Sequence, residues 1–391
     1  MITVGSSTLK KLALVTALSV WPGFVTHASA QLYSSSYIVD LNSKTVTKIG
    51  NLSSYNNTAT AINDAGQVVE FSNMTGGSYS SHAYITGPNG VGIKDLGTLG
   101  GANSAATGIN KAGQVVGYSE TAAGRTHAFI TGPNGGSLTD IGIHDYSSSD
   151  ATGVNDAGQV VGDADINIYA YAPFITGPNG ANMIGIGGSG VNGINARGQV
   201  VGYFNFVNTD GGYDNHAFIT GPNGEGMTDL GALGRYSLAT AINDAGQVVG
   251  YTATVEGSSH AFITSPNGVG MTDLAALGAL SAFPSYAQGI NDAGQVVGYY
   301  VTDAGSNESS WHAFITGPNG SGMTDLSSLV SFPGEVVLSY AVGINNHGQV
   351  LVNMVSSVPE PEVYAMLLAG LFLIGSNGMD ALFQNGIKVP I

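Results

Sequence analysis

The segment at residues 61–69 reads Ala-Ile-Asn-Asp-Ala-Gly-Gln-Val-Val, and versions of it recur along the 391-residue chain. Its Ile-Asn or Val-Asn pair occurs seven times, beginning at Ile62, Ile109, Val154, Ile194, Ile242, Ile290 and Ile344. A second segment runs in phase with it, with copies at His82, His127, Ala172, His216, His260 and His312 and a weaker copy at Tyr37. A third segment starts at Asp95, Asp140, Asp229, Asp273 and Asp325. The chain is therefore built from one repeating unit of about 46 residues.

Each unit holds four short apolar runs separated by turn signals. The sequence Gly-Pro-Asn-Gly, first at residues 87–90, places Pro where φ near −65° is favoured and Gly where φ is positive. Asn-Asp-Ala-Gly before Gln-Val-Val is typical of a type I turn with a glycine bulge. Four strands per unit, repeated seven times, predict an all-β, seven-bladed β-propeller of four-stranded blades at residues 31–354. An open β-solenoid is the alternative, although it would need distinct capping ends.

The composition supports a β-rich protein and excludes several other classes. The chain has 59 Gly, only 9% charged residues and 43% hydrophobic residues. A coiled coil or helical bundle would need far more Glu, Lys and Leu at helical spacing. The formal net charge of −16 argues against nucleic acid as a partner. The chain has no Cys, so a domain of this size would depend on core burial instead of disulfides.

Residues 1–30 have the pattern of a signal peptide that directs export. Lys10 and Lys11 precede the apolar stretch 12–20, and Ala28 and Ala30 supply small residues at a cleavage site. A membrane anchor is the alternative, but the apolar stretch is far shorter than the roughly 20 residues that span a bilayer. We therefore expect an exported mature protein that begins at Gln31.

The repeats resemble a known family. His-Ala-Phe, Asp-Leu-Gly and Gly-Ile-Asn-x-x-Gly-Gln-Val-Val-Gly-Tyr occur in order, as in the HAF family of bacterial extracellular repeats, over about residues 37–354. The resemblance implies an extracellular or cell-surface location and a repeat type. It implies no particular chemistry.

The tail at residues 355–391 resembles a second family. Pro359, Glu360 and Pro361 precede an apolar run, which is similar to the PEP-CTERM sorting signal. That resemblance implies processing by an exosortase, transient anchoring in the inner membrane, and a Gram-negative bacterium that makes exopolysaccharide. The apolar run ends near Ile374 and no Arg cluster follows it, so the pattern is degenerate. We expect this tail to be poorly ordered, although residues 381–388 faintly echo the start of a further repeat.

The connections between the strands differ in how constant they are. The Gly-Pro-Asn-Gly and Asn-Asp-Ala-Gly turns are nearly the same in every unit, and in an up-and-down sheet they would lie at one end of the blades. The other connections vary, for example at 73–81, 144–150, 205–215, 301–311 and 332–338. Variable loops grouped on one face of a rigid scaffold usually carry binding, so we expect any ligand at that face.

Repeated polar residues are interpreted as structural. The five recurrent histidines are spread around a ring and cannot converge on one metal ion, and Asn and Asp in turns cap their own backbone. Among residues that occur once, Asp163, Asp165 and Asn167 have a spacing that could present oxygens to Ca²⁺. Ile168 and Phe174 stand where a Ca²⁺ loop has Gly and Glu, and no other cofactor is indicated. No catalytic residues are predicted, since a His144-Asp145 pair has no nucleophile beside it.

Aromatic residues flank the variable loops and are candidates for contact with a ligand. They are Tyr169, Tyr171, Tyr203, Phe206, Tyr213, Tyr300 and Trp311. Burial between blades is the alternative role for these rings. The favoured hypothesis is an exported, non-catalytic, monomeric protein that binds extracellular matrix or exopolysaccharide through the variable face. The alternatives are a structural or adhesive surface protein with a protein partner, and an enzyme that acts on polysaccharide at the centre of the ring.

Overall fold

The computed structural model describes residues 31–50, 57–73, 80–142, 148–167, 170–208, 210–277, 280, 282–302, 310–330 and 339–358. The predicted signal peptide with Ala28 and Ala30, and the sorting motif at 359–361, lie outside these residues. Residues 34–355 form one compact unit, and the features described below belong to it. In the described part of the chain, no helix has the length and apolar character that a membrane span requires.

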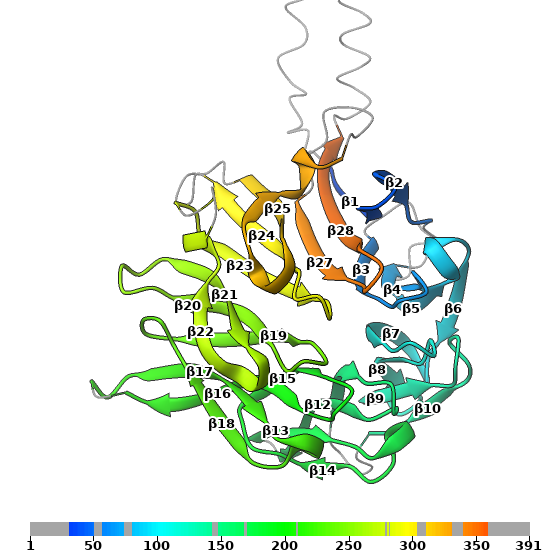
Figure 1. Ribbon diagram of the computed structural model, residues 1–391. Helices are drawn as coiled ribbons and strands as arrows, with labels where there is room; N and C mark the ends of the chain where they lie inside the picture. Colours follow the sequence, from blue (N-terminus) through cyan, green and yellow to red (C-terminus); the bar gives the residue numbers. More distant parts are fainter. Residues whose placement is uncertain are drawn as a thin grey trace, which may run out of the picture. The chain divides into compact units, whose positions relative to one another are not determined.

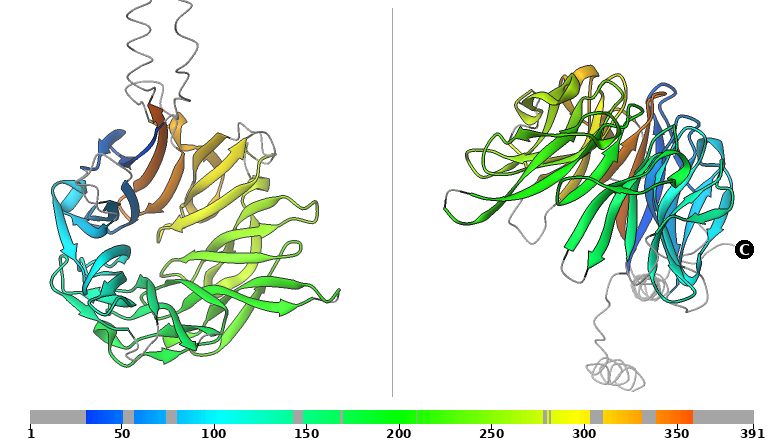
Figure 2. Two further views of the ribbon diagram at one scale, coloured as in Figure 1. Left: turned by 180° about the vertical axis from the view of Figure 1, so that it is seen from behind. Right: turned by 90° about the horizontal axis from the view of Figure 1, so that it is seen from below.

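Seven antiparallel four-stranded sheets are arranged around a central axis, as Figure 1 and the reverse view in Figure 2 show. Each of the first six sheets contains four consecutive strands, and we number them as blades 1 to 6. The strands of blades 1 to 3 are β3 (Asn57–Ile62), β4 (Val68–Asn73), β5 (Ser81–Thr86), β6 (Ile93–Gly97); β7 (Gly100–Ile109), β8 (Val115–Thr121), β9 (Thr126–Thr131), β10 (Leu138–Asp140); β11 (Ser149–Val154), β12 (Val160–Asn167), β13 (Ala170–Ile175) and β14 (Ile184–Gly185). The strands of blades 4 to 6 are β15 (Gly190–Ile194), β16 (Val200–Val207), β17 (Tyr213–Thr220), β18 (Met227–Gly231); β19 (Ser237–Ile242), β20 (Val248–Ala253), β21 (Ser259–Ser265), β22 (Val269–Asp273); β23 (Ser285–Ile290), β24 (Val296–Thr302), β25 (Ser310–Thr316) and β26 (Met323–Asp325).

Blade 7 joins the two ends of the repeat region. Its sheet order is β2-β1-β28-β27, so two strands come from the start of the chain and two from the end. These strands are β1 (Gln31–Asp40), β2 (Thr45–Lys48), β27 (Tyr340–Ile344) and β28 (Gln349–Val358). The weak first copy of the second repeat segment, at Tyr37, is therefore the third strand of this blade. Ser36 Oγ donates to Asn353 Oδ1 at 2.8 Å across the junction, 317 residues apart in sequence.

A ring of asparagines shows that the propeller is closed. In each blade the Asn that follows the innermost strand donates from Nδ2 to the backbone oxygen of the equivalent Asn in the next blade, at 3.0–3.3 Å. The acceptors, in order around the ring, are Asn110, Asn155, Asn195, Asn243, Asn291, Asn345 and Asn63. The last bond joins blade 7 back to blade 1, so the seven-bladed propeller is confirmed and the open solenoid is wrong.

The core lies between neighbouring blades, because each sheet is covered on both faces. The two valines after each Gln point to opposite faces of the second strand. Val68 packs with Ile38 and Leu351 of blade 7, whereas Val69 packs with Ala106 and Phe129 of blade 2. The Phe of the His-Ala-Phe segment is fully buried in five blades, and each such ring contributes roughly 1.5–3 kcal/mol to the stability of the interface. A single unit could not bury these faces alone.

The two constant turns lie at the same end of the blades, as predicted. Gly-Pro-Asn-Gly forms a short 3₁₀ turn. Both its Asn and its last Gly have positive φ, with 56° at Asn89 and 71° at Gly90. The backbone N–H of Asn89 donates to Ala65 O, and that of Gly90 donates to Gly66 O, which belong to the other constant turn. The short helices are η1 (Pro88–Gly90), η2 (Pro178–Gly180), η3 (Pro222–Gly224), η4 (Pro266–Gly268), η5 (Ala275–Leu277), η6 (Pro318–Gly320) and η7 (Leu326–Ser328). We call this end of the propeller the constant face and the opposite end the variable face.

Candidate functional site

The recurrent histidines and aspartates pair within their own blades. The His of the third strand contacts the Asp of the fourth strand through Nδ1, at 2.8–3.0 Å in four blades. The same Asp accepts a hydrogen bond from a backbone N–H two residues later, for example Gly231 N to Asp229 Oδ1 at 2.7 Å. In blade 6 the Tyr300 hydroxyl donates to Asp325 at 2.7 Å, and His312 is displaced to 3.8 Å. These pairs hold the two outer strands together and form no shared metal centre.

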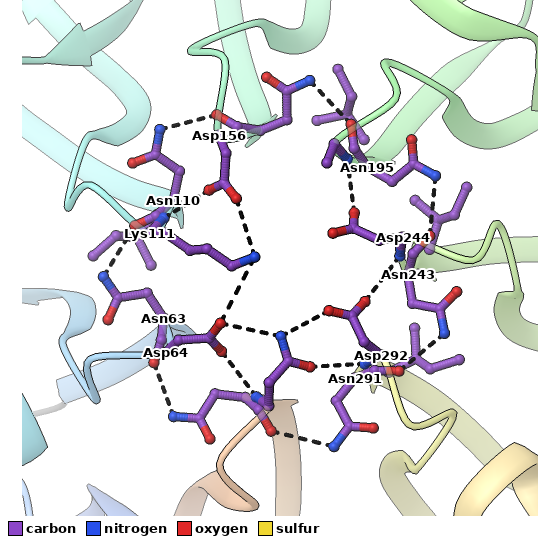
Figure 3. Close-up of a pocket in the computed structure, with 18 of the residues that line it drawn as sticks. Asn63, Asp64, Asn110, Lys111, Asp156, Asn195, Asn243, Asp244, Asn291 and Asp292 are labelled. Atoms are coloured by element: carbon purple, nitrogen blue, oxygen red, sulfur yellow. Dashed lines mark hydrogen bonds and ion pairs between the residues drawn. The ribbon is translucent and has the colours of Figure 1, made fainter.

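The mouth of the central channel on the constant face is lined by the same positions from all seven blades (Figure 3). The cavity there has a volume of about 170 Å³. The residues after the ring asparagines form an inner ring and are Asp64, Lys111, Asp156, Ala196, Asp244, Asp292 and Asn346. We call this opening the constant mouth.

Polar groups at the constant mouth satisfy one another. Asp64 accepts from both the backbone N–H and the Nδ2 of Asn346, at 2.9 and 3.1 Å. Lys111 lies between Asp64 and Asp156, with Nζ 3.9 and 3.3 Å from their carboxylates. Asn346 Nδ2 also donates to Asp292 Oδ2 at 2.9 Å. Because these groups already have partners, the constant mouth is a structural closure of the ring.

A second and larger cavity lies farther along the channel, away from the constant turns. Its volume is about 540 Å³. Polar side chains of the innermost strands line one part of it, and three tyrosines of blades 5 and 6 line another. The lining residues are Thr60, Thr107, Thr152, Asn192, Leu238, Thr240, Tyr251, Tyr286, Gln288 and Tyr299. We call this opening, toward the variable face, the variable mouth.

Five aromatic rings lie in contact along one side of the variable mouth. The ring centroids of Tyr251 and Tyr286 are 5.1 Å apart, and Tyr286 stacks on Tyr299 at 5.0 Å. Tyr340 of blade 7 meets Tyr299 at 5.1 Å, and Trp311 lies 5.0 Å from Tyr340. We call these five residues the aromatic row. The row crosses three adjacent blades, and its separations fall in the range of favourable aromatic pairs.

The tyrosines of the row are half-buried, and burial shifts the pKa of three of them. Burial, followed by the nearby Tyr286 and Tyr340, raises the pKa of Tyr299 to about 12. Burial is also the main cause that raises the pKa of Tyr251 and that of Tyr340. The hydroxyls of these tyrosines make no hydrogen bond to another described residue; they belong to Tyr251, Tyr286, Tyr299 and Tyr340. These hydroxyls are therefore available as donors and acceptors for a ligand.

The aromatic row depends on positions that differ from blade to blade. Tyr286 pairs with Tyr299 across β23 and β24, and the equivalent pair in blade 3 is Asp150 with Asp163. In blade 5 the pair is Leu238 with Tyr251. These register positions, at the level of the variable mouth, therefore hold aromatic residues on blades 5 to 7 and two aspartates on blade 3.

The predicted Ca²⁺ ligands lie on one strand of blade 3. Asp163 and Asp165 share a face of β12, and the side chain of Asn167 lies outside the described side chains. Burial, followed by the charge of Asp150, raises the pKa of Asp163 to about 6, although the N–H of Val191 lowers it. In the part of the chain that the structure describes, no group of three acidic or histidine side chains has the geometry of a metal site. The Ca²⁺ site at these residues stays a prediction.

The predicted aromatic residues have different surroundings. Trp311 belongs to the aromatic row and is 39% exposed. Tyr213 is 81% exposed near the tip of the β16–β17 hairpin, and Phe206 packs against His216 in the same hairpin. Tyr300 is buried at 5% exposure, so it presents no face to a ligand. Tyr203 is half-buried in β16, while Tyr169 and the side chain of Tyr171 lie outside the described part.

Sequence reasoning missed most of the aromatic row. Tyr251, Tyr286 and Tyr340 were not among the candidates, because strand neighbours across a blade cannot be paired without the register. A signal was present: Tyr286 and Tyr340 occupy the same place four residues before an Ile in two consecutive units. Aligning the units by position would have shown that aromatic residues gather in the last blades.

Comparisons with known proteins identify the fold. No protein family and no curated protein matches the chain by sequence. The structure is similar to a protein from Agrobacterium tumefaciens provisionally described as TolB, at 10% identity and a TM-score of 0.49, over 84% of this chain and 99% of that one. It is also similar to the β-propeller domain of the Trilobed protease from Pyrococcus furiosus, at 12% identity and a TM-score of 0.49, over 74% and 86%. A prolyl endopeptidase matches at 10% identity and a TM-score of 0.52, over 91% of this chain and 55% of its own. At these identities the likeness concerns the fold alone and shows nothing about activity.

Proposed function

We propose that this protein is an exported, non-catalytic propeller that binds a glycan chain of the extracellular matrix at the variable mouth. The observation that carries the proposal is the aromatic row beside the 540 Å³ cavity. Binding sites typically combine aromatic walls with a few polar groups that fix orientation. At this mouth Gln288 has no hydrogen-bond partner among the described residues, and the threonine hydroxyls, which donate to backbone oxygens, can still accept.

A glycan suits this arrangement better than a compact apolar ligand. A sugar ring presents C–H groups on its faces and hydroxyls around its edge, so it can lie on an aromatic face while its hydroxyls bond to neighbouring polar groups. Five contacting rings across three blades offer consecutive surfaces for more than one sugar unit. The tyrosine hydroxyls, which have no hydrogen-bond partner among the described residues, add donors and acceptors along the same line.

The proposed location follows from the two ends of the chain. The N-terminal pattern at Lys10–Ala30 supports export, and the tail at 359–361 supports sorting to the surface of a Gram-negative bacterium with an exosortase as a processing partner. We also propose that the repeats belong to the HAF family, on the residues that carry that resemblance. A matrix glycan would be the abundant polymer at such a surface.

The test is binding of defined oligosaccharides by the full-length protein. Isothermal titration with hexasaccharides should give saturable binding that the Tyr286→Ala variant weakens by about tenfold or more, in the range of hot-spot truncations. Tyr286→Phe should keep most of the affinity, because it keeps the ring. Tyr213→Ala is the matched control, since it removes an exposed tyrosine that lies outside the row. Equal loss in the control and in Tyr286→Ala, or no binding of any hexasaccharide, would overturn the proposal.

One observation favours a protein partner as the second candidate. Val207 and Tyr213 on the β16–β17 hairpin and Val255 on the next blade are 62, 81 and 90% exposed. The β16–β17 hairpin reaches outward beyond its neighbours (Figure 1). Exposed apolar side chains at hairpin tips suit contact with another protein. Loss of surface attachment in a Val207→Ser/Val255→Ser variant that still binds glycan would favour this candidate.

A further inference from the structure

We infer that the variable mouth selects glycans that carry free amino groups and rejects glycans that carry carboxylates or phosphates. This inference rests on the proposed function and names the class of ligand. It depends on the charges that surround the aromatic row.

Positive charge is absent from the described residues of this mouth. Neither the residues that line the 540 Å³ cavity nor the five residues of the aromatic row include Lys, Arg or His. A carboxylate or phosphate on the ligand would therefore lose its hydration without gaining an opposite charge.

Negative charge is present on blade 3 at the same level of the ring. Asp150 occupies in β11 the register position that Tyr286 occupies in β23, and Asp163 occupies that of Tyr299. Asp165 follows two residues later on the same face of β12. These carboxylates lie close enough to interact, since burial and then the charge of Asp165 raise the pKa of Asp150. An anionic ligand would be repelled, whereas an ammonium group would be attracted.

The aromatic row favours the same ligands. A cation over the face of a Trp or Tyr ring is attracted by the ring's electron density, and the effect grows when the site is partly desolvated. An amino sugar offers both the C–H face for stacking and the ammonium group for this attraction. Neutral N-acetylated sugars keep the stacking but lose the charge term. The geometry therefore orders the ligands as amino sugars first, neutral sugars second and uronic acids last.

The experiment compares four hexasaccharides with the full-length protein by isothermal titration at pH 7: glucosamine, N-acetylglucosamine, glucose and a uronic acid. We expect the glucosamine hexamer to bind at least about fivefold more tightly than its acetylated form, and the uronate to give no measurable heat of binding. Asp150→Asn should remove most of the difference between the first two and leave the neutral hexamers unchanged. The matched control is Asp156→Asn, which removes the same charge at the constant mouth.

Each outcome separates the inference from the proposed function. Equal binding of the amino and acetylated hexamers, with both weakened by Tyr286→Ala, would overturn the charge selection and leave glycan binding in place. Tighter binding of the uronate would also overturn the selection. If Asp156→Asn weakens glucosamine binding as much as Asp150→Asn does, the effect comes from overall charge and the assignment to Asp150 fails. No binding of any hexamer would overturn the proposed function itself.

Discussion

The two mouths of the central channel are built from the same seven blades but use them in opposite ways. At the constant mouth each blade supplies the same Asn and the same Gln, and their side chains bond to each other and to the next blade. At the variable mouth, residues in matching register positions are tyrosine, leucine or aspartate. The threonines and Asn192 there bond to backbone oxygens, whereas Gln288 and the tyrosine hydroxyls of the row have no hydrogen-bond partner among the described residues. The constant mouth therefore holds the blades together, whereas the variable mouth has the features of a binding site.

This difference shows how to interpret a polar residue in a repeat protein. A polar side chain that recurs in every blade has neighbours that recur with it, so its hydrogen bonds can be satisfied by symmetry. A residue that departs from the pattern loses those partners. It then either costs stability or takes part in binding. The predictions below test that division, beginning with the largest expected effect.

Breaking the asparagine ring should cost the most stability. Asn195 is 3% exposed, accepts from the backbone N–H of Arg197 and Gln199, and donates to Gln199 Oε1 and Asn243 O. Asn195→Ala leaves these buried groups unsatisfied, and we expect the free energy of unfolding to fall by about 3 kcal/mol. Urea denaturation followed by circular dichroism measures this change.

The matched control for the ring is at the other mouth. Gln288 lines the variable mouth at a comparable place on an inner strand and makes no hydrogen bond to another described residue. Gln288→Ala should change the free energy of unfolding by less than about 0.5 kcal/mol. If both variants lose the same stability, the two mouths do not differ in the way described here.

Glu70 should make the stability depend on pH. It occupies a place held by glycine in blades 2 to 6, is 1% exposed, and neither carboxylate oxygen has a hydrogen-bond partner in the described part of the chain. Burial raises its pKa from 4.5 to about 7. Because the folded state holds this proton more tightly than the unfolded state does, stability should fall as pH rises from about 4.5 to about 7. The total fall should be about 3 kcal/mol.

Replacing the Glu70 carboxyl with an amide tests whether Glu70 causes this pH dependence of stability. Glu70→Gln should flatten the pH profile and raise the free energy of unfolding at pH 8 by about 2 kcal/mol, while changing little at pH 4. Glu256→Gln is the control, because Glu256 is exposed on the β20–β21 loop. Unfolding curves at pH 4, 6 and 8 would refute the prediction if the wild type and Glu70→Gln had parallel profiles.

The sequence predicted the scaffold far better than the site. Repeat period, turn chemistry and strand count are local signals, and seven copies of Asn-x-x-Gly-Gln made the blade number countable. The end-to-end closure was less visible, since the two halves of blade 7 lie about 300 residues apart and only Tyr37-Ile38-Val39 pointed to it. The aromatic row was missed because it depends on which residues face each other across β23, β24 and β27. Tyr300 was misjudged as a ligand residue for a related reason: it and Tyr299 are adjacent in sequence, and alternation sends one to the mouth and the other into the interface.

Where a residue that differs from its equivalents lowers stability, replacing it with the residue of another blade should raise the free energy of unfolding. Asn353 of blade 7 donates to Ala59 O at 2.8 Å and accepts from Ala59 N at 3.2 Å, so both of its polar atoms are used. Asp163 is at the same place in blade 3, where one oxygen faces the N–H of Val191 and Oδ1 has no partner in the described part. Asp163→Asn can donate to the Val191 carbonyl, so we expect a gain of about 1 kcal/mol at pH 7.

The gain should depend on pH with a defined sign. The pKa of Asp163 is raised to about 6, so its carboxyl is protonated at lower pH. Burial costs least free energy in that neutral form. The advantage of Asp163→Asn should therefore shrink as the pH falls below about 6. Asp210→Asn is the control, because Asp210 is exposed in the β16–β17 loop. A loss of stability on Asp163→Asn, together with Ca²⁺ binding that titration detects in the wild type but not in the variant, would instead support the predicted metal site.

The smallest effect should come from the histidine–aspartate pairs. His216 contacts Asp229 at 3.0 Å, but both side chains are partly exposed, and the Asp keeps its bond to Gly231 N without the His. Exposed pairs of this kind contribute about 0–1 kcal/mol, so His216→Ala should lower the free energy of unfolding by about 0.5 kcal/mol. Glycan affinity should stay within twofold of the wild type, because the pair belongs to the repeated scaffold and lies away from the aromatic row. A tenfold loss of affinity in His216→Ala, with stability unchanged, would mean that a repeated polar residue has a binding role. The rule that repeated residues stabilise the scaffold and non-repeated residues bind would then be wrong at this position.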